Sequence, residues 1–500
     1  MDTLLANLGH GFVVAFSFQN LLFALIGALI GTAIGVLPGI GPVATISLLL
    51  PITFGQPATT AIIMLAGIYY GAQYGGSTTA ILLNLPGEIS SVVTTLEGYK
   101  MARNGRAGAA LATSALGSFF AGTVATILVA ASGPLLTSVA LSFGPADYFS
   151  LMLLGLIISA VLAQGSVLKS VGMVVLGVAL GLVGTDVQTG QQRFTFGIPE
   201  LSDGIGFVSV AMGMFGIAEI ILNLEKPEAR EVLSAKVGSL FLTKEEFRRA
   251  VPSVLRGTVL GSVLGILPGG GAALAAFGAY MLERKVSKGR HQFGTGAIEG
   301  VAGPEAANNA AAQTSFIPLL TLGIPANAVM ALMVGALIIQ GIQPGPRMVE
   351  AQPDLFWGLI ASMWIGNVML LVINLPMIGM WVKLLQVPYK YLYPSILIFC
   401  CIGVYSLNNN VFDVYQTVLF AIFGVICNKL KMEPAPLLIG FVLGPMMEEH
   451  LRRAMLLSRG DPSVFIERPI SASMLAIGAV VLGAMLLPNL RKGKDAAMQG

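Results

Sequence analysis

The chain has 500 residues, of which 55% are hydrophobic and only 11% are charged, and its net charge is +3. Soluble globular proteins carry roughly 25% charged residues, so this composition excludes a water-soluble domain. Uncharged apolar runs long enough to span a bilayer recur along the chain, at 107–131, 147–165, 205–224, 411–427 and 469–488. We therefore expect an all-α polytopic membrane protein with about 12 membrane segments, counting broken ones.

A break rich in glycine and proline interrupts the first apolar stretch. It reads G-x-x-x-G-V-L-P-G-I-G from Gly31 to Gly41, with the break itself at 35–42. Proline removes a backbone donor and glycine permits unusual dihedral angles, so a membrane helix should stop here. Hydrocarbon tolerates such a break only where protein or a polar cavity satisfies the freed backbone groups. The G-x-x-x-G part is more typical of a helix packing face than of a ligand site.

A polar motif at 69–88 follows the break and contains Ser77, Thr78 and Thr79 within an apolar segment. Hydroxyl groups are expensive in hydrocarbon unless they meet a partner, water or a ligand. Such hydroxyls can bind a ligand or bond back to their own helix carbonyls, and the sequence leaves both open. The motif ends at Pro86-Gly87, and we expect Glu88 to lie at a helix end.

The longest polar interval, 225–256, divides the chain into a first repeat (1–224) and a second repeat (257–490), followed by a tail (491–500). Lys and Arg close to membrane segments mark the cytoplasmic side. We therefore expect the interval to be a cytoplasmic linker and the tail to be cytoplasmic. The same rule places the basic loops Lys100–Arg106, Arg284–Arg290 and Arg452–Arg459 inside, and the loops 186–204 and 346–354, which are poor in basic residues, outside.

The second repeat carries the same two features. Its break, 265–271, follows the pattern G-x-x-x-G-I-L-P-G-G-G, and its proline lies 230 positions after the first (268 − 38). Its polar motif spans 300–325, and aligning Leu82 on Leu319 brings Ser77 opposite Thr314. The stretch between Arg256 and Arg284 is shorter than the roughly 40 residues that two crossings need. We therefore expect re-entrant hairpins that enter from opposite faces, which makes two inverted-topology repeats.

The chemistry of these motifs suits recognition of an anion, because half-helices that end within the membrane direct N–H groups and positive dipole ends into the cavity. Glu305 is a candidate for cation coupling, although a position in a loop beside Pro304 or a helix-capping role is equally open. No catalytic residue, metal site or cofactor is expected apart from Na⁺ or H⁺ as coupling ion. The substrate-binding candidates are backbone donors, hydroxyls and amides: Gly39, Gly41, Ser77, Thr78, Thr79, Gly269, Gly270, Gly271, Asn308, Asn309, Gln313, Thr314 and Ser315.

Several of these stretches together resemble one family, the large membrane subunit of the tripartite tricarboxylate transporters (TctA type). The resemblance rests on G-V-L-P-G-I-G-P (35–42), Y-Y-G-A-Q-Y-G-G-S-T-T-A-I-L-L-N-L-P-G-E (69–88), L-E-G-Y-K-M-A-R-N-G-R-A-G (96–108), G-I-L-P-G-G-G (265–271) and G-V-A-G-P-E-A-A-N-N-A-A-A-Q (300–313). It implies a multi-pass protein of the bacterial inner membrane and cation-driven import of di- and tricarboxylates, citrate among them. It also implies two partners, a periplasmic solute-binding protein and a small membrane subunit of about four helices.

Other function classes have weaker support. The chain has no G-x-x-x-x-G-K-[ST] loop for a nucleotide, no G-x-S-x-G or H-E-x-x-H motif, and only three widely separated histidines. We therefore do not expect an ATP-driven pump, an enzyme or a nucleic-acid-binding protein. A passive anion channel and an assembly scaffold without transport of its own remain open, since broken hairpins also occur in pores.

Overall fold

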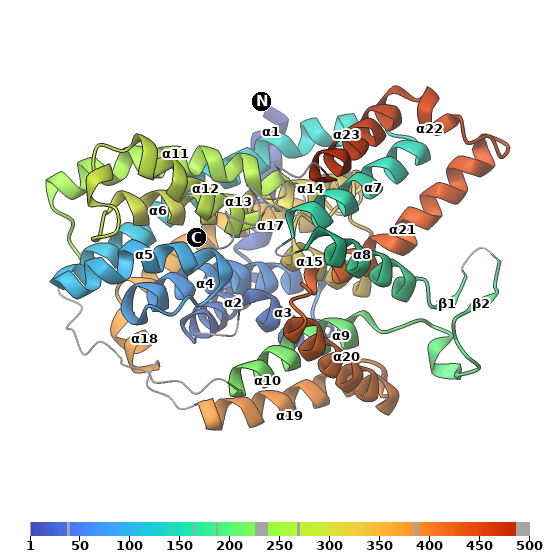
Figure 1. Cartoon of the computed structure of the whole chain (residues 1–500), viewed down its shortest axis with the longest axis horizontal. Coiled ribbons are helices and arrows are strands. Elements are labelled where there is room, and N and C mark those ends of the chain that lie inside the picture. The colour runs from blue at the N-terminus through green and yellow to red at the C-terminus, as the bar shows by residue number, and fades with distance from the viewer. Residues whose placement is uncertain are drawn as a thin grey trace.

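The computed structural model describes residues 2–37, 41–140, 142–163, 166–186, 189–225, 239–267, 271–384 and 389–486. Helices dominate the described chain, and β1 (Gly184–Thr185) pairs with β2 (Gln192–Arg193) in a small antiparallel hairpin at one extremity (Figure 1). Six helical stretches are long and apolar enough to cross a membrane: Phe18–Val36, Ile89–Leu135, Pro145–Leu162, Phe207–Leu224, Pro353–Asn374 and Val411–Lys429. The predicted all-α polytopic membrane fold is confirmed.

The helices of the first half are α1 (Asp2–Ala15), α2 (Phe18–Val36), α3 (Pro42–Thr53), α4 (Ala58–Leu83), η1 (Ile89–Ser91), α5 (Val92–Met101), η2 (Ala102–Arg106), α6 (Ala107–Ala140), α7 (Pro145–Leu162), α8 (Val167–Gly181), η3 (Pro199–Leu201), α9 (Phe207–Ala211), η4 (Met212–Ile217) and α10 (Ala218–Leu224). Those of the second half are α11 (Lys244–Ile266), α12 (Gly271–Val286), η5 (Arg290–Gln292), α13 (Glu299–Thr314), α14 (Phe316–Leu322), α15 (Ala328–Ile339), α16 (Met348–Ala351), α17 (Pro353–Asn374), α18 (Ile378–Leu384), α19 (Tyr389–Asn408), α20 (Val411–Lys429), α21 (Ala435–Leu457), α22 (Val464–Glu467) and α23 (Pro469–Leu486).

Both predicted breaks separate the two arms of a helical hairpin. The α2 helix ends at Val36 and α3 begins at Pro42, while α11 ends at Ile266 and α12 begins at Gly271. The candidate residues Gly39, Gly269 and Gly270 lie outside the described residues.

The polar interval predicted as a linker is shorter than expected. Helix α11 already begins at Lys244, because Thr243 and Glu246 form a capping box with backbone-to-side-chain bonds of 2.8 and 3.3 Å. The segment 244–256 therefore belongs to the first arm of the second hairpin, because its charged residues lie within one continuous helix, α11. Residues 226–238 and the tail lie outside the described residues.

Each hairpin packs on the helix that follows it through its G-x-x-x-G glycines. A methyl group on Gly31 would lie 2.3 Å from the Ile68 carbonyl oxygen, and one on Gly261 would lie 2.2 Å from that of Ala307. These distances require glycine, because a real methyl group is never this close to a carbonyl. The predicted packing role of the two G-x-x-x-G motifs is confirmed.

The same contacts fix how the two halves correspond. Ile68 and Ala307 are 239 positions apart (307 − 68), and so are Asn84 and Gly323 (323 − 84), which end α4 and α14 with φ of 59° and 73°. The alignment of Leu82 on Leu319 is therefore wrong by two positions. Leucines are frequent in both helices and make a poor marker of register, whereas helix ends are specific.

The two halves also pack across each other. Helix α6 lies on α13, where Asn309 Nδ2 donates to Ser118 Oγ at 2.7 Å, and α17 lies on α4, where Tyr74 donates to Asn367 Oδ1 at 2.9 Å. Along α4, the Tyr70 ring is beside that of Phe316 (6.0 Å between centroids), whereas the later Ser77 reaches the earlier Glu305. Helix α4 therefore runs in the direction opposite to α13 and to α14, which contains Phe316.

The two hairpins open at opposite ends of α6. The second opens beside its start, at what we call the basic end, where Lys100 Nζ donates to Gly294 O at 2.6 Å and Arg106 pairs with Glu246. The first opens at the other end of α6, which we call the β-loop end because the β1–β2 hairpin lies on that side of the molecule, opposite α5 (Figure 1). Gly133, near the end of α6, lies against Phe356 of α17. Two residues further along α17, Gly358 approaches Thr59, near the start of α4 and just after the first hairpin.

One topological prediction is wrong. Arg452 Nη1 lies 2.9 Å from Asp186 Oδ2, and Arg193 Nη1 lies 2.8 Å from Glu448 Oε1. The arginines at 452–459 and the loop 186–204 thus share the β-loop end, although their basic-residue counts predicted opposite faces. Arg452 and Arg193 are each neutralised by an acidic residue distant in sequence, so a count of basic residues alone misjudges this end.

Candidate functional site

The two polar motifs meet where α4 and α13 cross, around the buried carboxylate of Glu305. Ser77 Oγ donates to Glu305 Oε2 at 2.6 Å and Ser114 Oγ at 3.1 Å, while Thr94 Oγ1 donates to Oε1. The carboxylate therefore ties α13 to α4, α5 and α6. No lysine or arginine of the described chain forms an ion pair with it.

A second carboxylate, Glu88, lies nearby and is half-buried. It precedes η1 as its N-cap, which confirms the prediction that it lies at a helix end. Ser90 Oγ donates to Glu88 Oε1 and lies 3.1 Å from Gln73 Oε1, while Asn308 Nδ2 is 3.4 Å from Glu88 Oε1. The other end of the same amide, Asn308 Oδ1, is buried and makes no hydrogen bond within the described residues.

Asn327 is the counterpart of Glu88 in the second half, 239 positions later (327 − 88). It N-caps α15 with φ −156° and ψ 179°, against −150° and 170° at Glu88, and its Oδ1 accepts from Met330 N at 3.0 Å. Gly271, the first residue of α12, faces it: a methyl group there would lie 3.5 Å from Asn327 Cβ. Asn327 therefore borders the second break.

The partners of these two caps are equivalent as well. Asn308, which contacts Glu88, lies 239 positions after Tyr69 (308 − 69), and the side chains of Asn327, Ser315 and Gln73 lie near the Tyr69 hydroxyl. The centre of the protein thus contains two related groups of residues with different charge. We call Gln73, Glu88, Ser90 and Asn308 the acidic lobe, and Tyr69, Gly271, Ser315 and Asn327 the neutral lobe.

Most predicted hydroxyl candidates bond to helix carbonyls. Thr79 donates to Val36 O at 2.6 Å, Thr314 to Ala310 O at 3.1 Å and Ser315 to Ala312 O at 2.7 Å, with Thr78 3.4 Å from Tyr74 O. Gly41 serves as the N-cap of α3. A direct role of these groups in substrate binding stays a prediction.

The predicted amides differ in how far they are satisfied. Asn309 bonds to Ser118 and, at 3.1 Å, to Glu305 O, so it supports the Glu305 cluster. Gln313 Oε1, in contrast, is buried without a hydrogen-bond partner in the described part of the chain. Sequence reasoning missed Tyr69, Gln73 and Asn327. The sequence does contain a signal for Asn327: aligning the two halves on Pro86 and Pro325, the prolines at the ends of the two polar motifs, pairs Glu88 with Asn327.

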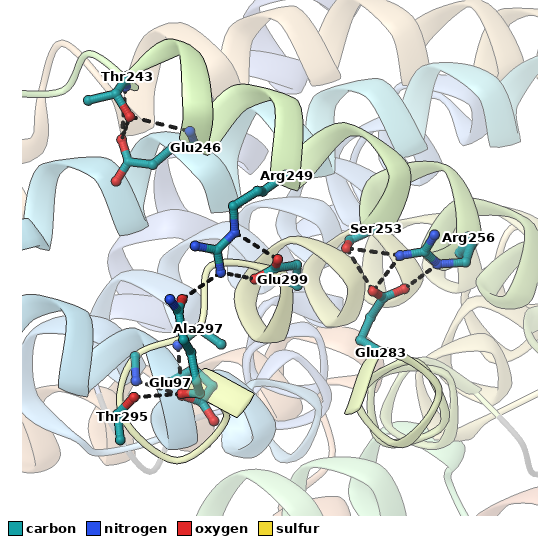
Figure 2. Close-up of polar contacts among 12 residues, drawn as sticks. Glu97, Thr243, Glu246, Arg249, Ser253, Arg256, Glu283, Thr295, Ala297 and Glu299 are labelled. Carbon is teal, nitrogen blue, oxygen red and sulfur yellow. Dashed lines mark hydrogen bonds and ion pairs between the residues drawn. The ribbon is translucent and has the colours of Figure 1, made fainter. Parts of the chain in front are cut away.

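Ion pairs between partly exposed arginines and buried carboxylates hold the second hairpin at the basic end (Figure 2). Arg249 bonds Glu299 through Nε (2.8 Å) and Nη2 (2.7 Å), and Arg256 bonds Glu283 through the same two atoms, both at 2.7 Å. Glu97 accepts from backbone N–H groups of the 294–297 loop, including Ala297 N at 2.9 Å. The hairpin, α13 and α5 are thereby joined on one side of the site.

Comparison with known proteins places this architecture in a family. The model of the tripartite tricarboxylate transporter TctA family matches residues 21–439. An uncharacterized 52.8 kDa protein in the TAR-I ttuC' 3' region of Agrobacterium vitis is 60% identical over 495 residues, 99% of each chain. A second Agrobacterium vitis protein, uncharacterized and in the TAR-II ttuC' 3' region, is 61% identical over 235 residues, 47% of this chain and 97% of its own. No solved structure matches. The chain belongs to the tripartite tricarboxylate transporter TctA family.

Proposed function

We propose that this tricarboxylate transporter subunit is the large membrane component of a secondary active, cation-coupled importer of di- and tricarboxylates. One observation carries the proposal. Two hairpin–helix units open at opposite ends of α6 and converge on one polar site between α4 and α13. Two broken units of this kind, arranged as inverted repeats around a central site, are the usual architecture for alternating access in secondary transporters.

The neutral lobe suits the carboxylate substrate. It combines the N-terminus of α12 at Gly271 with the Tyr69 hydroxyl, the Ser315 hydroxyl and the Asn327 amide. A helix N-terminus offers free N–H groups and the positive end of the dipole, and hydroxyls add further donors. In this proposal Gly269 and Gly270 contribute backbone donors from the break itself.

The carboxylates of the site favour coupling to a cation. Glu88 contacts Asn308, which follows Glu305 by three residues on α13, and no lysine or arginine of the described chain pairs with either carboxylate. An anionic substrate entering the same low-dielectric space is repelled by them unless a cation enters too. The membrane potential then supplies about 2.3 kcal/mol per charge per 100 mV.

The proposal includes the partners and the membrane. A periplasmic solute-binding protein delivers the carboxylate at the β-loop end, and a small membrane subunit of about four helices completes the complex. The basic end, with Lys100, Arg106 and Lys288, faces the cytoplasm of a bacterium whose inner membrane holds the protein.

The test is uptake of labelled citrate and a panel of dicarboxylates into proteoliposomes that contain this chain and its small subunit. The binding protein is added outside, and a Na⁺ or a proton gradient is imposed. We expect accumulation above equilibrium that requires both the gradient and the binding protein. Equilibration without accumulation would indicate a passive channel. No substrate movement with a correctly folded complex would indicate an assembly scaffold.

A further inference from the structure

We infer that the acidic lobe is a binding site for a monovalent metal cation, Na⁺, with Glu88 and Asn308 as its ligands. This inference deepens the proposed function, on which its role in coupling rests. The binding itself is a property of the residues and can be measured without transport.

The first argument is the buried amide oxygen of Asn308. Its side chain is 1% exposed, and Oδ1 makes no hydrogen bond within the described residues, while Nδ2 of the same amide lies 3.4 Å from Glu88 Oε1. Leaving such an acceptor unsatisfied costs roughly 1–3 kcal/mol. A cation shared with the neighbouring carboxylate satisfies it, whereas a proton serves two oxygens at most.

The second argument is the excess of oxygen acceptors around Glu88. Its carboxylate, the Ser90 hydroxyl and Gln73 Oε1 are neighbours, with Ser90 Oγ 3.1 Å from Gln73 Oε1, and the Asn308 amide adjoins them with Nδ2 3.4 Å from Glu88 Oε1. Hard cations are bound in proteins by such carboxylate, amide and hydroxyl oxygens. The one carboxylate of this lobe balances a single positive charge, which favours a monovalent cation over a divalent one.

The third argument comes from the equivalent position. Asn327 caps α15 with nearly the same backbone angles as Glu88, so a neutral amide is sufficient for that structural role. The charge of Glu88 is therefore not required by the fold. A charged side chain within a membrane protein is costly and usually serves an ion or a substrate.

The acidic lobe is also accessible to an ion and adjoins the first helix break. Glu88 is half-buried and the neighbouring Asn84, at the end of α4, is exposed, so an ion can reach the carboxylate. Gly87 lies against the last turn of α2, where a methyl group on Gly87 would be 2.2 Å from Gly35 O. The lobe thus adjoins the first helix break. The C-terminal end of a broken half-helix is where transporters coordinate Na⁺.

The test is binding of ²²Na⁺ to the purified full-length protein at constant ionic strength, with choline replacing sodium. Wild type is expected to bind Na⁺ saturably, and to melt at a higher temperature in Na⁺ than in choline. Glu88→Gln and Asn308→Ala are each expected to weaken Na⁺ binding by at least about tenfold, which corresponds to about 1.4 kcal/mol.

Asn374→Ala is the matched control. Asn374 in α17 also has a buried Oδ1 without a hydrogen-bond partner in the described chain, and its Nδ2 donates to Leu370 O at 2.9 Å, with no carboxylate bonded to it. Its replacement is expected to leave Na⁺ binding unchanged. Because Glu88→Gln is isosteric, the melting temperature of this variant in choline shows whether it folds.

The outcomes separate the two proposals. No saturable Na⁺ binding by the folded wild type, or full binding by the folded Glu88→Gln variant, would overturn the site, even if a proton gradient drives uptake. Sodium binding that depends on Glu88 would establish the site. If the reconstituted complex then failed to transport carboxylates, the proposed function alone would be wrong.

Discussion

Glu88 and Asn327 stand at equivalent positions of the two halves, 239 residues apart, and begin their helices with φ and ψ that agree within 10°. One is charged and the other is neutral. The fold therefore repeats itself in geometry but not in charge. We interpret this difference as the means by which one site accepts a cation and an anion side by side.

Removal of the Tyr69 hydroxyl should weaken carboxylate binding. Tyr69→Phe keeps the buried ring but removes a group that interacts with Ser315 and Asn327 in the neutral lobe. Loss of one neutral hydrogen bond corresponds to about 0.5–1.5 kcal/mol, so we expect the KM for uptake to rise roughly two- to tenfold. Sodium binding should persist.

Tyr70→Phe is the control for this variant. The Tyr70 hydroxyl is also buried but has no hydrogen-bond partner within the described residues. We expect unchanged KM and an equal or higher melting temperature, because an unsatisfied polar group is removed. Equal KM values for wild type and Tyr69→Phe would contradict the assignment of Tyr69 to substrate binding.

Substitution of the packing glycines should prevent tight assembly of each hairpin. Gly31→Ala and Gly261→Ala would place a methyl group 2.3 and 2.2 Å from backbone oxygens of α4 and α13. The helices must separate, so we expect a loss of roughly 1–3 kcal/mol, seen as a lower melting temperature in detergent. Gly366→Ala in α17, where nothing lies within 4 Å, should be neutral or stabilising. A Gly31→Ala protein as stable as wild type would refute this packing.

The ion pair between Arg256 and Glu283 in the second hairpin should contribute to stability because its carboxylate is buried. Glu283 is 1% exposed at its side chain, whereas Arg256 is 36% exposed. Arg256→Ala leaves a buried carboxylate without its cation, and we expect a loss of about 3 kcal/mol, reduced where water replaces the arginine. The melting temperature measures it.

Two further variants show whether the change in melting temperature of Arg256→Ala is due to the unpaired Glu283 carboxylate. The double variant Arg256→Met, Glu283→Leu should recover most of the lost stability, because no charge is then left unpaired. Arg248→Ala, which removes an exposed arginine of the same helix, should have little effect. Equal losses at Arg248 and Arg256 would mean that the pair with Glu283 has no special role.

Cysteine labelling can test which loops share a membrane face. In a variant without the three native cysteines, Phe196→Cys and Arg459→Cys should react with an impermeant maleimide from the same side, because Arg452 and Asp186 join their segments. Lys288→Cys, at the basic end, should react only from the other side, in inverted vesicles. Opposite accessibility of positions 196 and 459 would contradict the fold at the β-loop end.

The sequence predicts well what is encoded locally. Proline and glycine stop a helix wherever they stand, so the breaks after Val36 and Ile266 and the membrane class were predictable. Long-range pairing was not. Arg452 was misplaced because its partner Asp186 is far away in sequence, and the importance of Glu88 was missed because Asn308 lies 220 residues beyond it.

The Glu305 cluster has a consequence for how the protein is made. Its hydroxyl donors Ser77 and Ser114 precede it by 228 and 191 residues, so they are synthesised long before the carboxylate that they bind. Until α13 leaves the ribosome and enters the bilayer, these hydroxyls lack that acceptor and the acidic lobe lacks its amide. Membrane insertion of the nascent chain before α13 is synthesised therefore cannot create an ion path. The capacity to move a charged solute arises only as the second half folds onto the first.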